Sequence, residues 1–164
     1  MVSDPAGLLA LAVAVAEEAG AVLLAGQGSA GRVEHKSSAT DPVSEADRAA
    51  ERLIMQRLLA ARPDDGVLGE EGAERPGASG LRWVVDPLDG TVNYLYGRGD
   101  WAVSIACEDG RGGLVGAVCD PTRGEVFSAA RGAGASREGR RLRVNDPVAL
   151  EHALLATGFS YEAA

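Results

Sequence analysis

The sequence predicts an α+β fold in which two helices precede a largely antiparallel sheet. Apolar residues recur at helical spacing between residues 5 and 61, and short runs rich in β-formers follow from residue 67 onward. Turn signals such as Glu-Asp-Gly and Arg-Gly-Ala-Gly separate those runs, as they do in hairpins. Helices first and hairpins afterwards are typical of α+β domains.

The composition narrows the class of protein. With 164 residues, of which 46% are hydrophobic, the chain can bury the core of one domain of ordinary size. A net charge of −8 disfavours nucleic acid or an anionic membrane as the main partner, because both attract basic surfaces. The apolar run before Gly26 is broken by Glu17 and Glu18 and lacks a basic start. We therefore expect no membrane span, no secretory signal and a cytoplasmic location.

The first helix is predicted from Asp4 to Gly26. Asp4 is a good N-cap, and Pro5 suits the first helical position, where a backbone N–H is not needed. The apolar residues that recur at helical spacing, and that we expect to pack on a core, are Leu8, Leu11, Val15 and Val22.

The second helix is predicted to start at Ser44 and to end before Pro63. Ser44 can cap it, and the turn sequence Asp64-Asp65-Gly66 follows its end. The apolar positions expected to face the core are Leu53, Ile54 and Leu58.

The sheet is predicted from β-rich runs at residues 67–68, 82–85, 102–107, 114–119 and 125–129. Cys107 and Cys119 fall within these runs without metal or redox spacing, so we interpret them as small buried hydrophobes. The basic stretch 137–143 has no interleaved aromatic residues, which favours a solvated hairpin over a binding patch.

An apolar run from Trp83 ends abruptly in two aspartates, Asp86 and Asp89. Pro87 cannot donate to a strand ladder, so we expect the backbone to leave the sheet directly after Asp86. The two carboxylates and the Leu88 carbonyl could then be aimed at one point, an oxygen set that suits Mg²⁺.

The next two residues, Gly90 and Thr91, open a predicted helical turn. Its free N–H groups and positive dipole end favour an anion, so metal and phosphate could meet there. The alternative for the whole stretch is a polar turn with an ordinary N-cap.

Further acidic positions bear on that choice. Glu70 and Glu71 end another β-rich run, and Asp47 lies in the first turn of the second helix, where helix capping is the simpler interpretation. Together with the two aspartates they could converge on a two-metal site for phosphoryl transfer. Glu71 could orient another ligand or face solvent. Lys36, the only lysine, could be a cation held near an anion or an ordinary surface residue.

Three segments, 41–47, 69–71 and 83–94, in that order and spacing, resemble the inositol monophosphatase family of Mg²⁺-dependent, lithium-sensitive phosphatases. The resemblance covers essentially the whole chain. It implies the N-terminal half of a layered αβαβα fold. The metal ligands that it implies, with the first aspartate bridging, are Glu70, Asp86, the Leu88 carbonyl and Asp89.

The resemblance also implies catalytic and substrate-binding roles. Thr91, paired with Asp47, would orient the attacking water, and Glu70 belongs to the same catalytic set. Substrate contacts would come from Asp89, which touches a substrate hydroxyl, from the phosphate-binding amides of Gly90 and Thr91, and from Lys36. Metal-activated water needs no histidine, so we interpret His35 and His152 as surface or packing residues.

The activity implied is Mg²⁺-dependent hydrolysis of inositol monophosphate, a small-molecule phosphate monoester, by a homodimer. Val92 and residues 93–97 fit this branch better than the histidinol-phosphate branch, while fructose bisphosphate and phosphoadenosine phosphates stay open as substrates. A haloacid-dehalogenase-type phosphatase is disfavoured, because one residue separates its aspartates and two separate them here.

The sequence departs from the family at its end. The family has a second half, with a Trp-Asp motif that supplies a further metal ligand. We expect residues 1–150 to form a metal- and phosphate-binding domain, and residues 151–164 to begin a truncated second α/β domain. Such a chain would have little activity alone and would self-associate. The remaining alternative is a truncated, non-catalytic interaction module.

Overall fold

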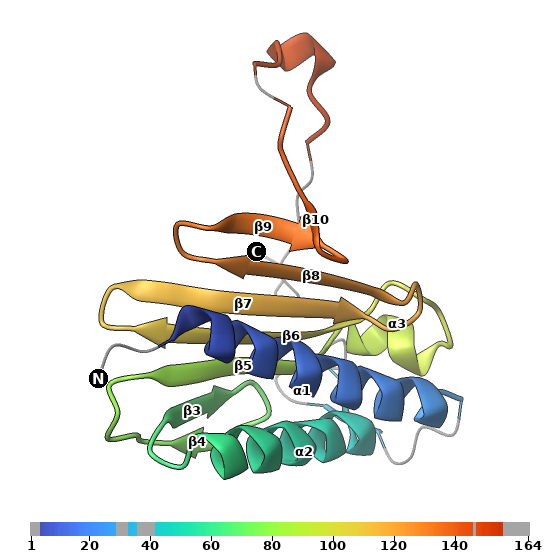
Figure 1. Cartoon of the computed structure of the whole chain (residues 1–164). Coiled ribbons are helices and arrows are strands. Elements are labelled where there is room, and N and C mark those ends of the chain that lie inside the picture. Colours follow the sequence, from blue (N-terminus) through green and yellow to red (C-terminus); the bar gives the residue numbers. More distant parts are fainter. Residues whose placement is uncertain (1–3, 29–32, 36–41, 146, 156–164) are drawn as a thin grey trace, which may run out of the picture.

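A computed structural model of the chain describes residues 4–28, 33–35, 42–145 and 147–155. Its centre is an eight-stranded sheet with the strand order β10-β9-β8-β7-β6-β5-β3-β4. Helices α1 and α2 lie against one face of this sheet (Figure 1). The helices are α1 (Pro5–Gly26), α2 (Glu45–Ala61), α3 (Thr91–Leu95) and the 3₁₀ turn η1 (Leu150–His152). The strands of the sheet are β3 (Gly66–Gly69), β4 (Glu74–Arg75), β5 (Arg82–Asp89), β6 (Ala102–Asp109), β7 (Gly112–Asp120), β8 (Glu125–Ala130), β9 (Gly134–Arg137) and β10 (Arg140–Arg141).

The predicted α+β class and the order of the elements are confirmed. All strand pairs of the large sheet are antiparallel except β3 and β5, which run parallel from Gly66↔Arg82 to Gly69↔Val85. Neither this parallel pair nor the short hairpin of β1 (Val33–His35) and β2 (Pro42–Ser44), which precedes α2, was predicted from the sequence. The parallel pair decides where the candidate site forms.

Helix α1 begins as predicted, since the Asp4 side chain accepts a hydrogen bond from the Ala6 N–H at 3.1 Å. Its buried stripe is richer in small residues than expected and includes Ala12, Ala16 and Gly20. A Cβ added at Gly20 would lie 2.6 Å from Pro121 Cγ, so the helix approaches the sheet too closely there for any side chain. The buried residues of α1 are Leu8, Ala12, Val15, Ala16, Ala19, Gly20 and Leu23.

The predicted core role of Val22 is wrong, because its side chain is 52% exposed. The face of α1 that is buried at this end of the helix carries Ala19, Gly20 and Leu23 instead. By length and composition α1 would also pass for a membrane-crossing helix. In this fold its buried stripe packs on β6, β7 and α2, as a core helix does.

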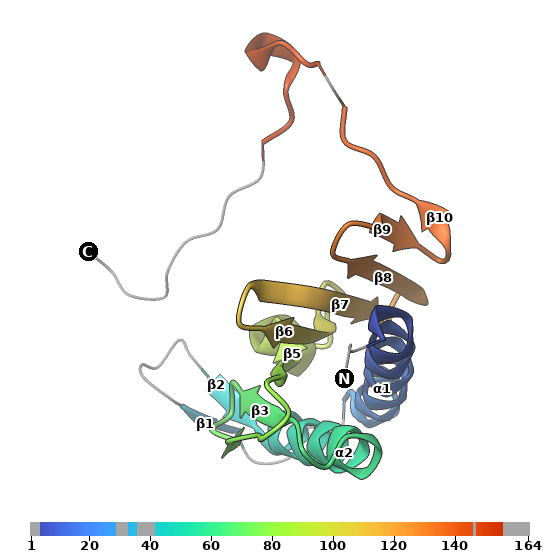
Figure 2. The same cartoon turned by 60° about the vertical axis from the view of Figure 1, so that its left-hand side comes forward.

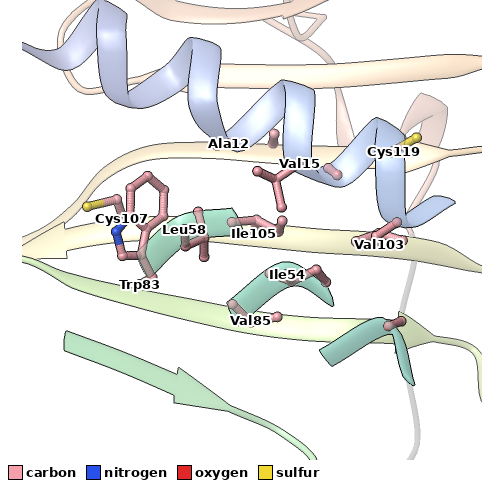
Figure 3. Close-up of a cluster of buried hydrophobic side chains, with 14 of the residues drawn as sticks. Ala12, Val15, Ile54, Leu58, Trp83, Val85, Val103, Ile105, Cys107 and Cys119 are labelled. Atoms are coloured by element: carbon pink, nitrogen blue, oxygen red, sulfur yellow. The ribbon is translucent and has the colours of Figure 1, made fainter. Parts of the chain in front are cut away.

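The hydrophobic core lies between the two long helices and the sheet (Figure 3). Trp83, Val85 and Ile105 from the strands meet Ile54 and Leu58 from α2, which confirms the predicted inward face of that helix. Leu53 is only partly buried.

The two cysteines are buried within the sheet and are not bonded to each other, as predicted. Burial raises the pKa of the Cys107 thiol to about 12 and that of Cys119 to about 11. Both therefore stay neutral thiols that act as small hydrophobes.

The expectation that the backbone leaves the sheet after Asp86 is wrong. Strand β5 continues to Asp89, which pairs with Ala102 of β6 after a register shift. Pro87 sits inside that irregularity, where no ladder hydrogen bond is required of it. Since β3 ends at Gly69, opposite Val85, the second edge of β5 is also free at this point. The bulge allows the strand to accept the proline.

The basic stretch forms the β9–β10 hairpin, whose turn places Glu138 and Gly139 at positive φ. Its arginines are exposed, as predicted for a solvated hairpin. Beyond β10 the chain leads away from the sheet to η1 (Figure 2). His152 lies there and is exposed. The expected second domain at 151–164 lies largely outside the described residues and stays a prediction.

Candidate active site

The parallel strands bring two acidic residues to the same edge of the sheet. The last register pair of β3 and β5 is Gly69↔Val85, and the Glu70 N–H continues the ladder by donating to the Val85 carbonyl at 3.0 Å. The residues that follow this pair are Glu70 and Asp86. In sheets with parallel strands, ligands bind beyond the carboxyl ends of those strands.

Asp86 and Glu70 meet through their carboxyl groups, which share a hydrogen bond. Burial, followed by the charge and hydrogen bond of Glu70 and the charge of Asp89, raises the pKa of Asp86 to about 7. The Leu88 N–H, which donates to Asp86 Oδ1 at 3.1 Å, lowers this pKa but does not outweigh the other effects. The strand end therefore concentrates negative charge that a proton or a cation can neutralise.

The chain turns sharply directly after Asp89. Gly90 has a φ of +92°, in the left-handed region that glycine enters without strain. A Cβ at this position would also lie 2.9 Å from the Asp100 carbonyl oxygen. Both the backbone angle and the close contact require glycine, and α3 starts at the next residue, Thr91, as predicted.

Thr91 links this turn to helix α2. Its Oγ1 lies 3.0 Å from Asp47 Oδ1 and 3.1 Å from the Leu88 carbonyl oxygen. A hydroxyl carries one proton, so Thr91 donates to one of these two acceptors at a time. Asp47, in the first turn of α2, is only 1% exposed. The predicted pairing of Asp47 with Thr91 is thus present as a contact.

Helix α1 fixes the far end of α3. The buried Tyr94 hydroxyl donates to the Leu23 carbonyl at 3.0 Å, and Gln27 Nε2 donates to the Arg98 carbonyl at 2.9 Å. The ring of Tyr94 meets Trp101 edge-on with a centroid separation of 5.2 Å. Burial raises the pKa of Tyr94, which keeps its hydroxyl a proton donor. These contacts were not predicted from the sequence, because they join residues that are distant along the chain.

Metal binding is supported by the chemistry of the donors. Glu70 and Asp86 are in contact, Asp89 is close enough to raise the Asp86 pKa, and the Leu88 carbonyl adds a neutral oxygen. Hard oxygens with excess negative charge suit a divalent cation such as Mg²⁺. Across residues 4–28, 33–35, 42–145 and 147–155, however, no three acidic, histidine or cysteine side chains already enclose a single point. The fit rests on donor type and charge.

The structure therefore assembles most of the predicted residues from different elements. Glu70 meets Asp86, and Asp47 meets Thr91. Leu88, Asp89 and Gly90 lie between these two pairs in the sequence. Lys36 and the side chain of His35 lie outside the described residues. The roles predicted for these residues in catalysis and binding stay predictions.

Glu71 is held in a way that neither of its two interpretations anticipated. Its backbone N–H donates to Glu51 Oε1 at 3.0 Å. Glu51 was not singled out in the sequence, where it is one of several charged residues on a helix.

Relatives of this chain are known. Residues 4–164 match the sequence profile described as the inositol monophosphatase family. An inositol-1-monophosphatase of Rhizobium meliloti is 51% identical over 120 residues, 72% of this chain and 45% of that protein. The Nus factor SuhB of Pseudomonas aeruginosa is 47% identical over 131 residues, 77% of this chain and 48% of that protein.

A solved structure shares the fold. The extragenic suppressor protein suhB of Bartonella henselae superposes with a TM-score of 0.80 at 40% identity, covering 85% of this chain and 54% of the other. The chain spans about half the length of the curated relatives it matches.

Proposed function

Because the chain belongs to the inositol monophosphatase family, we propose that it serves as a Mg²⁺-dependent phosphatase that hydrolyses inositol monophosphate. The observation that carries this proposal is the Glu70–Asp86 carboxyl pair at the end of the parallel strands. The Asp47–Thr91 hydrogen bond, which ties α3 to the start of α2, adds to it. Members of the family are generally metal-dependent phosphatases, which supports the same assignment.

The residues that would hold Mg²⁺ are Glu70, Asp86, the Leu88 carbonyl and Asp89. A bound divalent cation neutralises phosphate charge and lowers the pKa of water, which makes water a nucleophile near neutral pH. The high pKa of Asp86 means that a proton competes with the metal at this position.

Thr91 and Asp47 would act on the attacking water. Water that donates a hydrogen bond to Thr91 Oγ1 is oriented for attack on phosphorus while Thr91 donates its own proton to Asp47. Asp47 then accepts the proton that water loses, through the threonine hydroxyl. The P–O bond to the alcohol would break with its electron pair on the alcohol oxygen, which takes a proton from solvent, while Asp47 returns its proton to solvent and phosphate and inositol leave. The Gly90 and Thr91 amides would hold the phosphate, together with Lys36, while Asp89 would contact a substrate hydroxyl.

A substrate panel tests the proposed activity. Phosphate release is measured from inositol 1-phosphate, histidinol phosphate, fructose 1,6-bisphosphate and 3′-phosphoadenosine phosphate, with this chain and with a chain extended by the second half of a relative. In the extended chain we expect inositol phosphate to be the best substrate, turnover to require Mg²⁺, and Asp86→Asn to abolish it, whereas this chain alone should release little phosphate. No Mg²⁺-dependent release from any of the four by the extended chain would refute the proposal.

A metal titration tests the site separately from activity. A ligand that binds only the folded state raises the melting temperature by mass action. Mg²⁺ should therefore stabilise the chain, and Asp86→Asn should remove most of that gain. An unchanged melting curve of the unmodified chain, even at high Mg²⁺ concentration, would count against a metal site at this strand end.

A second candidate function is binding without catalysis, favoured by the name Nus factor that a relative 47% identical to this chain carries. A partner protein captured equally by the unmodified chain and by Asp86→Asn, without phosphate release, would favour this alternative. We also propose a cytoplasmic location and a homodimer for the phosphatase.

A further inference from the structure

Glu51 is a buried carboxylate whose position needs explanation. It lies in α2 and is 6% exposed. The other acidic side chains buried in the described part of the chain have evident partners. Asp47 accepts from Thr91, and Asp65 accepts from Arg62 and from the indole N–H of Trp83. Glu51 instead accepts from a backbone, the N–H of Glu71.

Gly69 makes this contact possible. A Cβ added at Gly69 would lie 2.0 Å from Glu51 Oε1 and 2.8 Å from its Cδ. Any side chain at this position would push the carboxylate aside and would separate it from the Glu71 N–H. Gly69, at the end of β3, therefore leaves the space that the Glu51 carboxylate of α2 occupies, and the hydrogen bond to Glu71 depends on both residues.

The contact between Glu51 and the segment after Gly69 bears on Glu70, because the backbone is hydrogen-bonded on both sides of that residue. The Glu70 N–H donates to the Val85 carbonyl of β5, and the Glu71 N–H donates to Glu51 of α2. The backbone on both sides of Glu70 is thus anchored, on one side to the strand that carries Asp86 and on the other to a helix.

Helix α2 carries a second contact to the site one turn earlier. Asp47 and Glu51 are four residues apart, so they share a face of the helix. Asp47 accepts from the Thr91 hydroxyl, and Glu51 accepts from the Glu71 N–H. Helix α2 therefore contacts both the turn that carries Thr91 and the segment that carries Glu70.

We propose that Glu51 is a positioning residue that, with Gly69, holds Glu70 where its carboxyl meets Asp86 and so sets the affinity of the site for a divalent cation. The inference rests on the proposed function, in which Glu70 binds metal. Residues that orient metal ligands typically contribute about 10–100-fold to metal affinity.

Matched variants separate the hydrogen bond from the charge and from general stability. Glu51→Leu removes the acceptor, whereas Glu51→Gln keeps an acceptor oxygen and loses only the charge. Gly69→Ala displaces the carboxylate without changing it. Ile54→Val, which trims a buried side chain of the same helix away from the site, is the control for general destabilisation.

The first measurement is amide hydrogen exchange at Glu71 by NMR in the full chain without metal. We expect faster exchange in Glu51→Leu and Gly69→Ala than in Ile54→Val, and near-native exchange in Glu51→Gln. In a Glu51→Leu background, Gly69→Ala should add little, because the two substitutions break the same contact. Glu71 exchange that is equal in Glu51→Leu and Ile54→Val would overturn the proposal.

The second measurement is the midpoint of the Mg²⁺-dependent rise in melting temperature. We expect it to move about 10–100-fold to higher Mg²⁺ in Glu51→Leu and Gly69→Ala, and little in Glu51→Gln and Ile54→Val. An unmoved midpoint in Glu51→Leu, while the unmodified chain responds to Mg²⁺, would overturn the role in metal affinity. If the unmodified chain itself does not respond, the proposed function fails, and the exchange data alone decide whether Glu51 holds Glu70.

Discussion

At the scale of single residues, Asp86 binds its proton more tightly in the fold than in the unfolded chain. Its pKa rises from an ordinary 3.8 to about 7, first because of burial and then because of Glu70 and Asp89. Between these two pH values the folded state holds more protons than the unfolded state, so the free energy of unfolding falls as pH rises through this range. At neutral and higher pH, the buried Asp86 carboxylate therefore lowers the free energy of unfolding.

The substitution Asp86→Asn should remove that cost. An amide oxygen can still accept the Leu88 N–H, and the charge that Glu70 and Asp89 repel is gone. In chelator at pH 8 we expect stabilisation by about 1 kcal/mol, or about 2–4 °C in melting temperature for a chain of this size. The gain should shrink as pH is lowered from about 7 towards 3.8, and it should vanish below 3.8, where Asp86 is protonated in both states. A variant less stable than its parent at pH 8 would contradict this account.

Thr91 provides a test of the link between α3 and α2. Thr91→Val keeps the shape of the side chain but leaves the buried Asp47 without one of its donors. Loss of a hydrogen bond to a buried acceptor costs about 1–3 kcal/mol. Thr91→Ser keeps the hydroxyl and should recover most of this loss in denaturant unfolding. Equal stability of the valine and serine variants would mean that the hydroxyl contributes nothing.

At the scale of elements, the close approach of α1 to the sheet depends on Gly20. A Cβ there would lie 2.6 Å from Pro121 Cγ and 3.2 Å from Cys119 Sγ. Gly20→Ala should therefore destabilise the chain by about 1–3 kcal/mol through overpacking, although alanine favours helix. Gly26→Ala is the control, because among the described residues its Cβ would meet only the Tyr94 hydroxyl, at an ordinary contact distance of 3.4 Å. If thermal unfolding showed both variants to be stabilised, the packing argument would be wrong.

Most of the helices and strands were predictable from the sequence, because helix caps and apolar periodicity are local features of a sequence. The Asp4 cap and the inward positions Ile54 and Leu58 follow from propensity and periodicity. The parallel pairing of β3 with β5 was not predictable in this way, since strand neighbours depend on contacts between distant segments. The bulge at Pro87 is similar, because a proline alone does not show whether a strand ends or is interrupted.

The candidate site was predictable where its residues lie in one turn, as from Asp86 to Thr91. The meeting of Glu70 with Asp86 was one possibility raised by their positions at strand ends, whereas the pairing of Asp47 with Thr91 was implied by the family resemblance alone. Glu51 was missed because a glutamate on a helix usually faces solvent. It is buried in a space left by Gly69, 18 residues further along and on a different element.

At the scale of the whole molecule, apolar side chains remain exposed on the segment after β10. Val144 is 87% exposed, and Leu150 and Leu154 are 78% and 99% exposed on or beside η1. This segment leads away from the sheet (Figures 1 and 2), so the described part of the chain does not bury these side chains. Exposed apolar clusters of this kind favour association with another surface.

We therefore expect the 164-residue chain to self-associate in a concentration-dependent way through this segment. The double variant Leu150→Ser/Leu154→Ser should shift sedimentation towards monomer, because each serine removes apolar area that association would bury. Val22→Ser/Leu24→Ser, which trims exposed apolar residues on α1, is the matched control and should leave association unchanged. A chain that sediments as a monomer at high concentration, or an equal effect of the two double variants, would show that the segment after β10 does not drive assembly.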